Sequence, residues 1–272
     1  MKNNFSIENK VIAITGGTGS LGTSISEYLV QKGAIIIILG RNSSSLIKHV
    51  DKLNESIPSS SSSYVVDILD ENKLKEISKK IIIDHGRLDG LINAAGGNLK
   101  EATVNTGQTI FDIFPDNLKK VIDLNLMGTV LPSLILGKIM ANQKSGSIIN
   151  ISSMASKDAL SRVLGYSIGK AGVEIFTKWM AMELAAKFGE KMRVNAISPG
   201  FFIGKQNKEL LVNEDGSYTR RGNAIINKTP MNRFGKVNEL NGTIEYLLSD
   251  ASSFVTGTIL NVDGGFSSFS GV

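Results

Sequence analysis

Residues 10–40 read KVIAITGGTGSLGTSISEYLVQKGAIIIILG and contain the pattern that decides the fold. An apolar run at 10–14 is followed by a glycine-rich turn, and a helical pattern at 24–33 stops at Gly33. The β-branched run Ile35–Leu39 comes next. Strand, turn, helix and strand in this order predict a β-α-β unit with a right-handed crossover between parallel strands.

The rest of the chain continues the same alternation without a linker, so we expect one domain over residues 1–272. Its fold class is α/β, a doubly wound parallel sheet with helices on both faces. The further strands are expected at 64–66, 88–92, 147–151, 194–197 and 258–262, and the further helices near 44–55, 70–84, 237–248, from about 116, and from Tyr166 to about 188.

Three segments interrupt this alternation. The serine run at 58–63 (PSSSSS) is predicted to be a flexible connector. Pro132 is predicted to begin or kink the second half of the helix that starts near 116. Residues 201–229 are the most polar and least periodic large piece, and we expect this segment to close over a substrate.

Composition narrows the function classes. The 272 residues include no Cys and two His, which excludes disulfides and a thiolate nucleophile and argues against a metal site. The formal charge of +5 is spread along the chain and suits an anionic ligand, but no basic arm or aromatic platform indicates a nucleic-acid partner. The polar N-terminus and the short apolar runs predict no signal peptide and no membrane partner, so we expect a cytoplasmic protein.

The glycine turn Thr15–Gly22 follows a predicted strand and opens a predicted helix. Glycines there let the backbone approach a pyrophosphate at the helix N-terminus, although a tight turn without a ligand would show the same residues. Small residues in the run 93–96 (NAAG), at the end of another predicted strand, leave room for a ribose or a flat ring.

The end of strand 35–39 carries Arg41 and no acidic residue. A guanidinium there fits a 2′-phosphate, so NADP is the preferred cofactor and NAD, with Arg41 as a solvated charge, is the alternative. Asp67, at the end of the next strand, could bond an adenine amino group or could cap a turn.

Tyr166 and Lys170 are four residues apart in a helical pattern, so their side chains share one face. An ammonium beside a phenol is expected to lower the pKa of Tyr166 and make it an acid and base, although an exposed Tyr-Lys pair has the same spacing. Ser153, after the predicted strand 147–151, could hold a substrate carbonyl. Asn125 is either a buried structural amide or a link in a proton relay.

Taken together, TGGTGSLG, NAAG, RVNAISPG and VDGG resemble the short-chain dehydrogenase/reductase family over nearly the whole chain, and the order and spacing of four residues resemble its catalytic tetrad. The resemblance implies a Rossmann-type fold with Asn125, Ser153, Tyr166 and Lys170 as the catalytic residues. It implies cofactor contacts at Gly16, Thr18, Ser20, Leu21, Gly22, Arg41, Asn42, Asp67, Ile68, Asn93, Ala94, Gly96, Tyr166, Lys170, Pro199, Gly200 and Phe202.

The last third resembles the D-mannonate oxidoreductase (fructuronate reductase) branch, in PGFFIGKQNKELL and TRRGNAIINKTPMNRFG. This implies a small sugar-acid substrate and a homotetramer or homodimer. A gluconate 5-dehydrogenase-like or 3-oxoacyl reductase, and a non-catalytic nucleotide-sensing protein, are the alternatives. The expected substrate contacts are Asn98, Ser153, Arg162, Gln206 and Asn207, with Arg162 first for the carboxylate.

Overall fold

In the computed structural model, which describes residues 3–204 and 207–270, seven strands form one sheet in the order β3-β2-β1-β4-β5-β6-β7. Every neighbouring pair is parallel. The strands are β1 (Val11–Thr15), β2 (Ile35–Gly40), β3 (Ser61–Val65), β4 (Gly90–Asn93), β5 (Gly146–Ile151), β6 (Met192–Pro199) and β7 (Ile259–Val262). The helices are α1 (Ser20–Gln31), α2 (Ser43–Ser56), α3 (Glu71–His85), α4 (Pro115–Ile122), α5 (Gly128–Gln143), α6 (Leu164–Phe188), α7 (Lys208–Leu211), α8 (Arg220–Lys228) and α9 (Asn241–Leu248).

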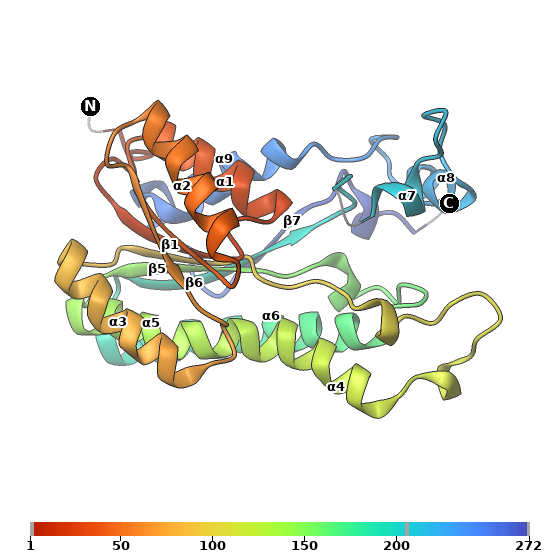
Figure 1. Ribbon diagram of the computed structural model, residues 1–272, viewed down its shortest axis with the longest axis horizontal. Helices are drawn as coiled ribbons and strands as arrows, with labels where there is room; N and C mark the ends of the chain where they lie inside the picture. The colour runs from red at the N-terminus through yellow and green to blue at the C-terminus, as the bar shows by residue number, and fades with distance from the viewer. Residues whose placement is uncertain (1–2, 205–206, 271–272) are drawn as a thin grey trace.

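The helices cover both faces of the sheet, as the strand–helix alternation predicts. Figure 1 shows α1, α2 and α9 on one face and α3, α5 and α6 on the other. Strand residues alternate between the two layers: Ile12 and Ile14 belong to the core under α1 and α9, whereas Val11 and Ala13 belong to the core under α3, α5 and α6. A sheet buried on both faces explains why its central strands read as continuous apolar runs.

The parallel register brings the carboxyl ends of the central strands to one edge. Thr15 pairs with Asn93, Asn93 with Asn150, and Asn150 with Ala196. Beyond this edge lie the loop of residues 94–114 and the segment that carries α7 and α8, which extend to the right of the sheet in Figure 1. Ligands of doubly wound sheets bind at this edge, so these two segments border the candidate site.

The prediction of a connector at 58–63 was wrong for the second half of this serine run, whereas residues 58–60 form a turn. Residues 61–63 begin β3, where Ser61 pairs with Ile36 of β2. The Asn54 side chain accepts from the Ser61 N–H (2.9 Å) and donates to its carbonyl (3.0 Å), and the Ser62 hydroxyl lies 3.1 Å from His85 Nε2. An edge strand tolerates polar side chains when neighbouring helices supply partners, which composition alone does not reveal.

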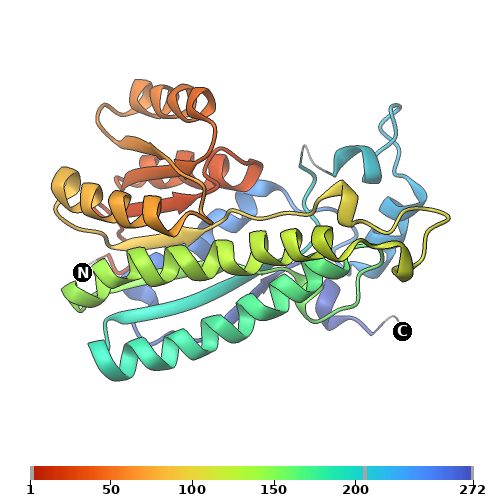
Figure 2. The ribbon, with the colours of Figure 1, turned by 60° about the horizontal axis from the view of Figure 1, so that its bottom comes forward.

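Pro132 neither begins α5 nor marks the irregular turn. α4 passes into α5 through a widened π-helical turn at Asp123–Met127, and Pro132 lies inside α5 one turn later. The continuous helix Pro115–Gln143 is long enough to span a membrane and contains an 18-residue window with a mean hydropathy of 1.5, but half of that window is buried inside the protein. Figure 2 shows it running beside α6 along the sheet, where a core helix needs such apolar residues.

Two isoleucines on α3 differ in burial, so substituting each one tests which face of this helix packs against the sheet. Ile81 is fully buried in the core, and Ile83, two residues later, is 79% exposed. We expect Ile81→Ala to lower the free energy of unfolding by about 2–5 kcal/mol, since it removes packed methyl groups and leaves a cavity. The matched Ile83→Ala should change it by less than about 0.5 kcal/mol. Urea unfolding of both variants measures the difference, and equal losses would contradict this packing.

Candidate active site

The glycine turn between β1 and α1 brings the backbone close to neighbouring segments at the edge of the sheet. Gly16 has φ of +65°, and a Cβ there would lie 2.7 Å from the Ala95 Cα. A Cβ on Gly22 would lie 2.5 Å from the Gly16 carbonyl oxygen. Thr18 and Ser20 are exposed, and no side chain caps the N-terminus of α1. The free N–H groups of that first turn fit the pyrophosphate of a dinucleotide.

Two distant segments lie against this turn. The Ala95 N–H, after β4, donates to Thr15 Oγ1 at 3.2 Å. A Cβ on Gly204, after β6, would lie 3.4 Å from Ser20 Oγ, so the chain leaving β6 passes beside the start of α1. Leu21 is partly buried against the core under α1. Of three further predicted contacts, Pro199 is the last residue of β6, and Gly200 and Phe202 follow it.

The predicted ribose contacts lie at the ends of β2 and β3. Arg41 is exposed, and its Nη1 lies 4.0 Å from the Asp67 carboxylate. Asn42 caps α2, since its Oδ1 accepts from the backbone N–H three residues further along at 2.8 Å. Asp67 also accepts from the N–H two residues further along (3.0 Å), so the turn-cap interpretation holds for it. Ile68 is buried, so the charged groups at these strand ends are Arg41 and Asp67, which lie within ion-pair distance of each other.

Asn93, predicted as a cofactor contact, has its side chain inside the core. Its exposed fraction is 1%, and its Nδ2 donates to Ser133 Oγ and to Asn150 Oδ1, both at 2.8 Å. Asn150 in turn donates to Thr177 Oγ1 at 2.9 Å. This chain of amides and hydroxyls joins β4, β5, α5 and α6, so the Asn93 side chain holds the sheet edge together rather than reaching a ligand. The following Ala94 is partly buried.

Gly96 and Asn125 fix the loop after β4. The Asn125 Oδ1 accepts from the Gly97 N–H (3.1 Å), and its Nδ2 donates to the Gly97 carbonyl (2.7 Å) and the Val121 carbonyl (2.9 Å). A Cβ on Gly96 would lie 2.8 Å from Asn125 Oδ1 and 3.3 Å from Lys170 Nζ. The widened helical turn therefore serves to aim Asn125 at this loop, beside the Lys170 ammonium.

Ser153, Tyr166 and Lys170 meet at the end of β5. Ser153 is 8% exposed in the turn after β5, and a hydrogen bond links its hydroxyl to the Tyr166 phenol. Lys170 is 4% exposed, its Nζ donates to the Ile151 carbonyl at 2.6 Å, and it lies 5.7 Å from the centre of the Tyr166 ring. The structure thus brings together all four residues of the predicted tetrad, including Asn125.

The expected pKa shift of Tyr166 was wrong in direction for the protein without ligands. Burial raises the pKa of Tyr166, and only the hydrogen bond from Ser153 opposes the rise. Burial also lowers the pKa of Lys170 to about 8, because the interior disfavours its charge. The phenol is therefore protonated at neutral pH, which suits a proton donor.

A buried carboxylate supports the turn that carries Ser153, and the sequence interpretation missed it. Glu174 Oε1 accepts from Ser152 Oγ at 3.0 Å and from Ser156 Oγ, so it ties together the residues on either side of Ser153. Glu174 follows Lys170 by four residues on α6, and this spacing places it on the helix face that carries Tyr166 and Lys170. This four-residue spacing was the sequence signal that could have identified Glu174 as a neighbour of the site.

The predicted substrate contacts fall into different surroundings. The Asn98 amide donates to Thr103 Oγ1 (2.6 Å), within its own loop. Asn207 caps the chain after β6, accepting from the Gly204 N–H (2.8 Å) and donating to the Phe202 carbonyl (2.9 Å). Both amides are thus engaged in holding loops. Gln206 lies outside the described residues.

Arg162 also holds a loop. Its Nε donates to the Val104 carbonyl and its Nη2 to Asn105 Oδ1, each at 3.0 Å. The Val104 N–H in turn donates a hydrogen bond to the Arg162 carbonyl at 3.0 Å. Arg162 therefore fastens the loop of residues 94–114 to the segment between Ser153 and Tyr166, and this fixes the wall of the site.

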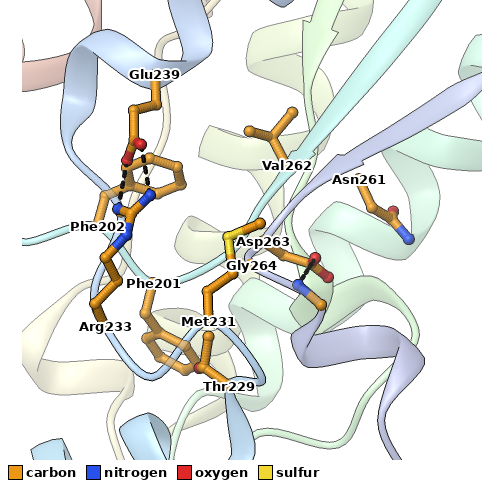
Figure 3. A pocket seen from close by; sticks show the side chains of 12 residues that line it. Phe201, Phe202, Thr229, Met231, Arg233, Glu239, Asn261, Val262, Asp263 and Gly264 are labelled. Atoms are coloured by element: carbon orange, nitrogen blue, oxygen red, sulfur yellow. Dashed lines mark hydrogen bonds and ion pairs between the residues drawn. The ribbon is translucent and has the colours of Figure 1, made fainter.

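A cavity of about 430 Å³ lies at the ends of β6 and β7 (Figure 3). Arg233 closes one side of it with two hydrogen bonds to Glu239, at 2.8 and 2.7 Å. The lining includes none of the four tetrad residues. It consists of Phe201, Phe202, Thr229, Met231, Arg233, Gly235, Glu239, Asn261, Val262, Asp263, Gly264 and Gly265.

Residues 16–267 match the family model described as enoyl-(acyl carrier protein) reductase. The chain is 38% identical to an uncharacterized oxidoreductase of Haemophilus influenzae, over 99% of this chain and 97% of that protein. It is 32% identical to a 3-oxoacyl-[acyl-carrier-protein] reductase of Thermotoga maritima, over 95% and 98%. A solved structure from Haemophilus influenzae, described as a candidate D-mannonate oxidoreductase with bound NAD, superposes with a TM-score of 0.91 at 37% identity and covers 98% of both chains.

The buried Lys170 predicts a pH-dependent stability. An unfolded lysine titrates near 10.5, whereas the pKa of Lys170 in the fold is about 8. Between these pH values the unfolded chain binds more protons, so this group makes the protein more stable as pH rises.

We expect the stability of wild type relative to Lys170→Met to increase between pH 7.5 and 10 by on the order of 1–3 kcal/mol. Urea unfolding at several pH values measures it, with Lys178→Met, exposed on the same helix, as the matched control. Parallel pH curves for wild type and Lys170→Met would contradict the burial of the charge.

Proposed function

The chain belongs to the short-chain dehydrogenase/reductase family of NAD(P)-dependent oxidoreductases, and from this premise we propose that its substrate is a sugar acid. The reaction proposed is the interconversion of D-fructuronate and D-mannonate. Support comes from the likeness to the structure described as a candidate D-mannonate oxidoreductase, over 98% of both chains. The observation that carries catalysis is the meeting of Ser153, Tyr166 and Lys170 beside the glycine turn.

The proposed roles follow from the environment of each side chain. The Ser153 hydroxyl holds the substrate carbonyl, and Tyr166, protonated at neutral pH, donates its proton to the carbonyl oxygen during reduction. In the reverse direction the phenolate accepts that proton. Lys170 stabilises the phenolate and bonds the cofactor ribose, and Asn125 holds the loop at Gly97. A bound nicotinamide cofactor supplies or accepts the hydride.

We propose NADP as the preferred cofactor and NAD as an accepted one. The β2 end has the exposed Arg41 and no acidic residue, and the first turn of α2 has none either, so a 2′-phosphate would meet a guanidinium and a helix N-terminus. Asp67, 4.0 Å from Arg41, weakens this preference through its charge. The glycine turn and the small residues after β4 would hold the rest of the dinucleotide.

We propose that the protein is a homodimer or homotetramer in the cytoplasm. Ile168, Ile175, Trp179 and Met182 recur at helical spacing on α6, and all four are exposed. Such an apolar stripe is stable in water when a second surface covers it, and a second copy of α6 is complementary to it.

A substrate panel tests the proposed function. We expect NAD(P)H oxidation at 340 nm with D-fructuronate and the reverse reaction with D-mannonate, and little turnover of a 3-oxoacyl thioester. In Tyr166→Phe, turnover should fall by about 10²–10⁴-fold, because the proton donor is lost while the fold is kept. Cofactor binding, measured by fluorescence, should be nearly unchanged. Preferred turnover of gluconate or of the thioester would favour the alternative reductases, and wild-type turnover in Tyr166→Phe would remove Tyr166 from its role.

The cofactor preference has its own test. Arg41→Leu should raise the KM for NADPH by about 10–100-fold, because a charge-assisted bond to the 2′-phosphate is lost. The KM for NADH should change little. Lys48→Leu, an exposed cation on α2, is the matched control. Equal changes with both cofactors in Arg41→Leu would contradict a phosphate contact at this residue.

A further inference from the structure

Two arginines meet over the segment that joins Ser153 to Tyr166. Arg221 Nη1 donates to Ser161 Oγ at 2.9 Å, and Ser161 is followed directly by Arg162. Burial lowers the pKa of Arg221, and the positive charge of the nearby Arg162 lowers it further. They come from separate parts of the chain, α8 and the segment before α6.

The packing of α8 fixes this meeting. Ile225 and Ile226, on the inner face of α8, belong to a small core with Met154, the residue after Ser153. Leu160 packs against the same core from the segment before Arg162. α8 is therefore seated on the turn that carries one catalytic residue, and Arg221 projects from its first turn toward the segment leading to Tyr166.

The charge of this pair is not compensated. Within residues 3–204 and 207–270, no carboxylate lies within ion-pair distance of Arg162 or Arg221, whereas Arg233 pairs with Glu239 and Arg41 with Asp67. The first turn of α8 has no acidic residue either, so the positive end of the helix dipole adds to the same field. Like charges drawn together in a partly buried place cost free energy unless an anion joins them.

The two arginines differ in what they can offer an anion. Arg162 donates hydrogen bonds from Nε and Nη2 to residues 104 and 105. Its backbone has a φ of +79°, an unfavourable conformation that these hydrogen bonds help to hold. Arg221 is partly buried. Among the described residues, its side chain donates one hydrogen bond, to the neutral Ser161 hydroxyl. The remaining N–H groups of Arg221 form the planar fork that suits a carboxylate.

We propose that Arg221, with Arg162 behind it, binds the carboxylate of the substrate and selects for an acid over its neutral counterpart. This inference rests on the proposed function and changes the first candidate for the carboxylate from Arg162 to Arg221. The anionic end of the substrate lies under α8, and the carbonyl lies at Ser153 and Tyr166. The substrate class is thus a short polyhydroxy acid whose carboxylate and carbonyl are at opposite ends.

The experiment compares D-fructuronate with D-fructose, which lacks the carboxylate. In Arg221→Met, we expect kcat/KM for D-fructuronate to fall by about 10–100-fold, mainly through KM, because a bond made in both ground and transition states is lost. The slow turnover of D-fructose should be unchanged. Arg221→Lys should be intermediate, since it keeps the charge and loses the fork. Arg220→Met removes the exposed neighbouring cation and is the matched control.

Unchanged kcat/KM for D-fructuronate in Arg221→Met, or an equal fall for both substrates, would overturn the proposal. Arg221→Gln repeats the measurement with a shorter polar side chain if the Met variant does not fold. Calorimetric binding of D-gluconate to the enzyme with NADP separates the two claims. If wild type turns over no sugar acid yet binds gluconate, and Arg221→Met loses that binding, the proposed function fails and the anion site stands. No binding to wild type overturns the site.

Discussion

The hydrogen bond from the Lys170 ammonium to the Ile151 carbonyl is the contact on which the site depends. It ties α6 to the last residue of β5 and takes an ammonium out of water. The cost of that burial appears as the lowered pKa of Lys170, about 8, and the bonded carbonyl offsets part of it. Lys170 lies one turn after Tyr166 on α6, so the bond is made next to the place where the phenol meets Ser153.

Around this bond the protein buries several polar side chains that are hydrogen-bonded to one another. Asn93, Asn150 and Thr177 form one chain of hydrogen bonds, and Glu174 holds the serines on both sides of Ser153. Polar groups in a low-dielectric interior tolerate few alternative arrangements, so a satisfied network holds the strand ends rigidly. The Ser153 and Tyr166 hydroxyls, proposed to act in catalysis, are thereby held in place.

The substrate side of the site is built differently. α8 sits on a small apolar core that includes Met154, and the loop of residues 94–114 is fastened by Arg162. Both segments join at the residues between Ser153 and Tyr166. A change in either segment would alter the shape of the pocket while leaving the sheet and the cofactor turn intact. This arrangement lets one fold accept different substrates within the family.

Local sequence patterns were sufficient to predict the doubly wound sheet, the glycine turn and the shared helical face of Tyr166 and Lys170. The periods of strands and helices, and the need for residues without Cβ in a tight turn, are properties of neighbouring residues. Other features depend on tertiary contacts between residues far apart in the sequence. The serine run became a strand because β2 and Asn54 supplied its partners. The pKa of Tyr166 went up because burial, set by the whole fold, outweighed the proximity of a lysine. Arg162 holds the loop of residues 94–114 through hydrogen bonds, and Arg221 lies near it because α8 packs over a segment some sixty residues earlier in the chain. Contacts at such a separation leave no periodic pattern in the local sequence.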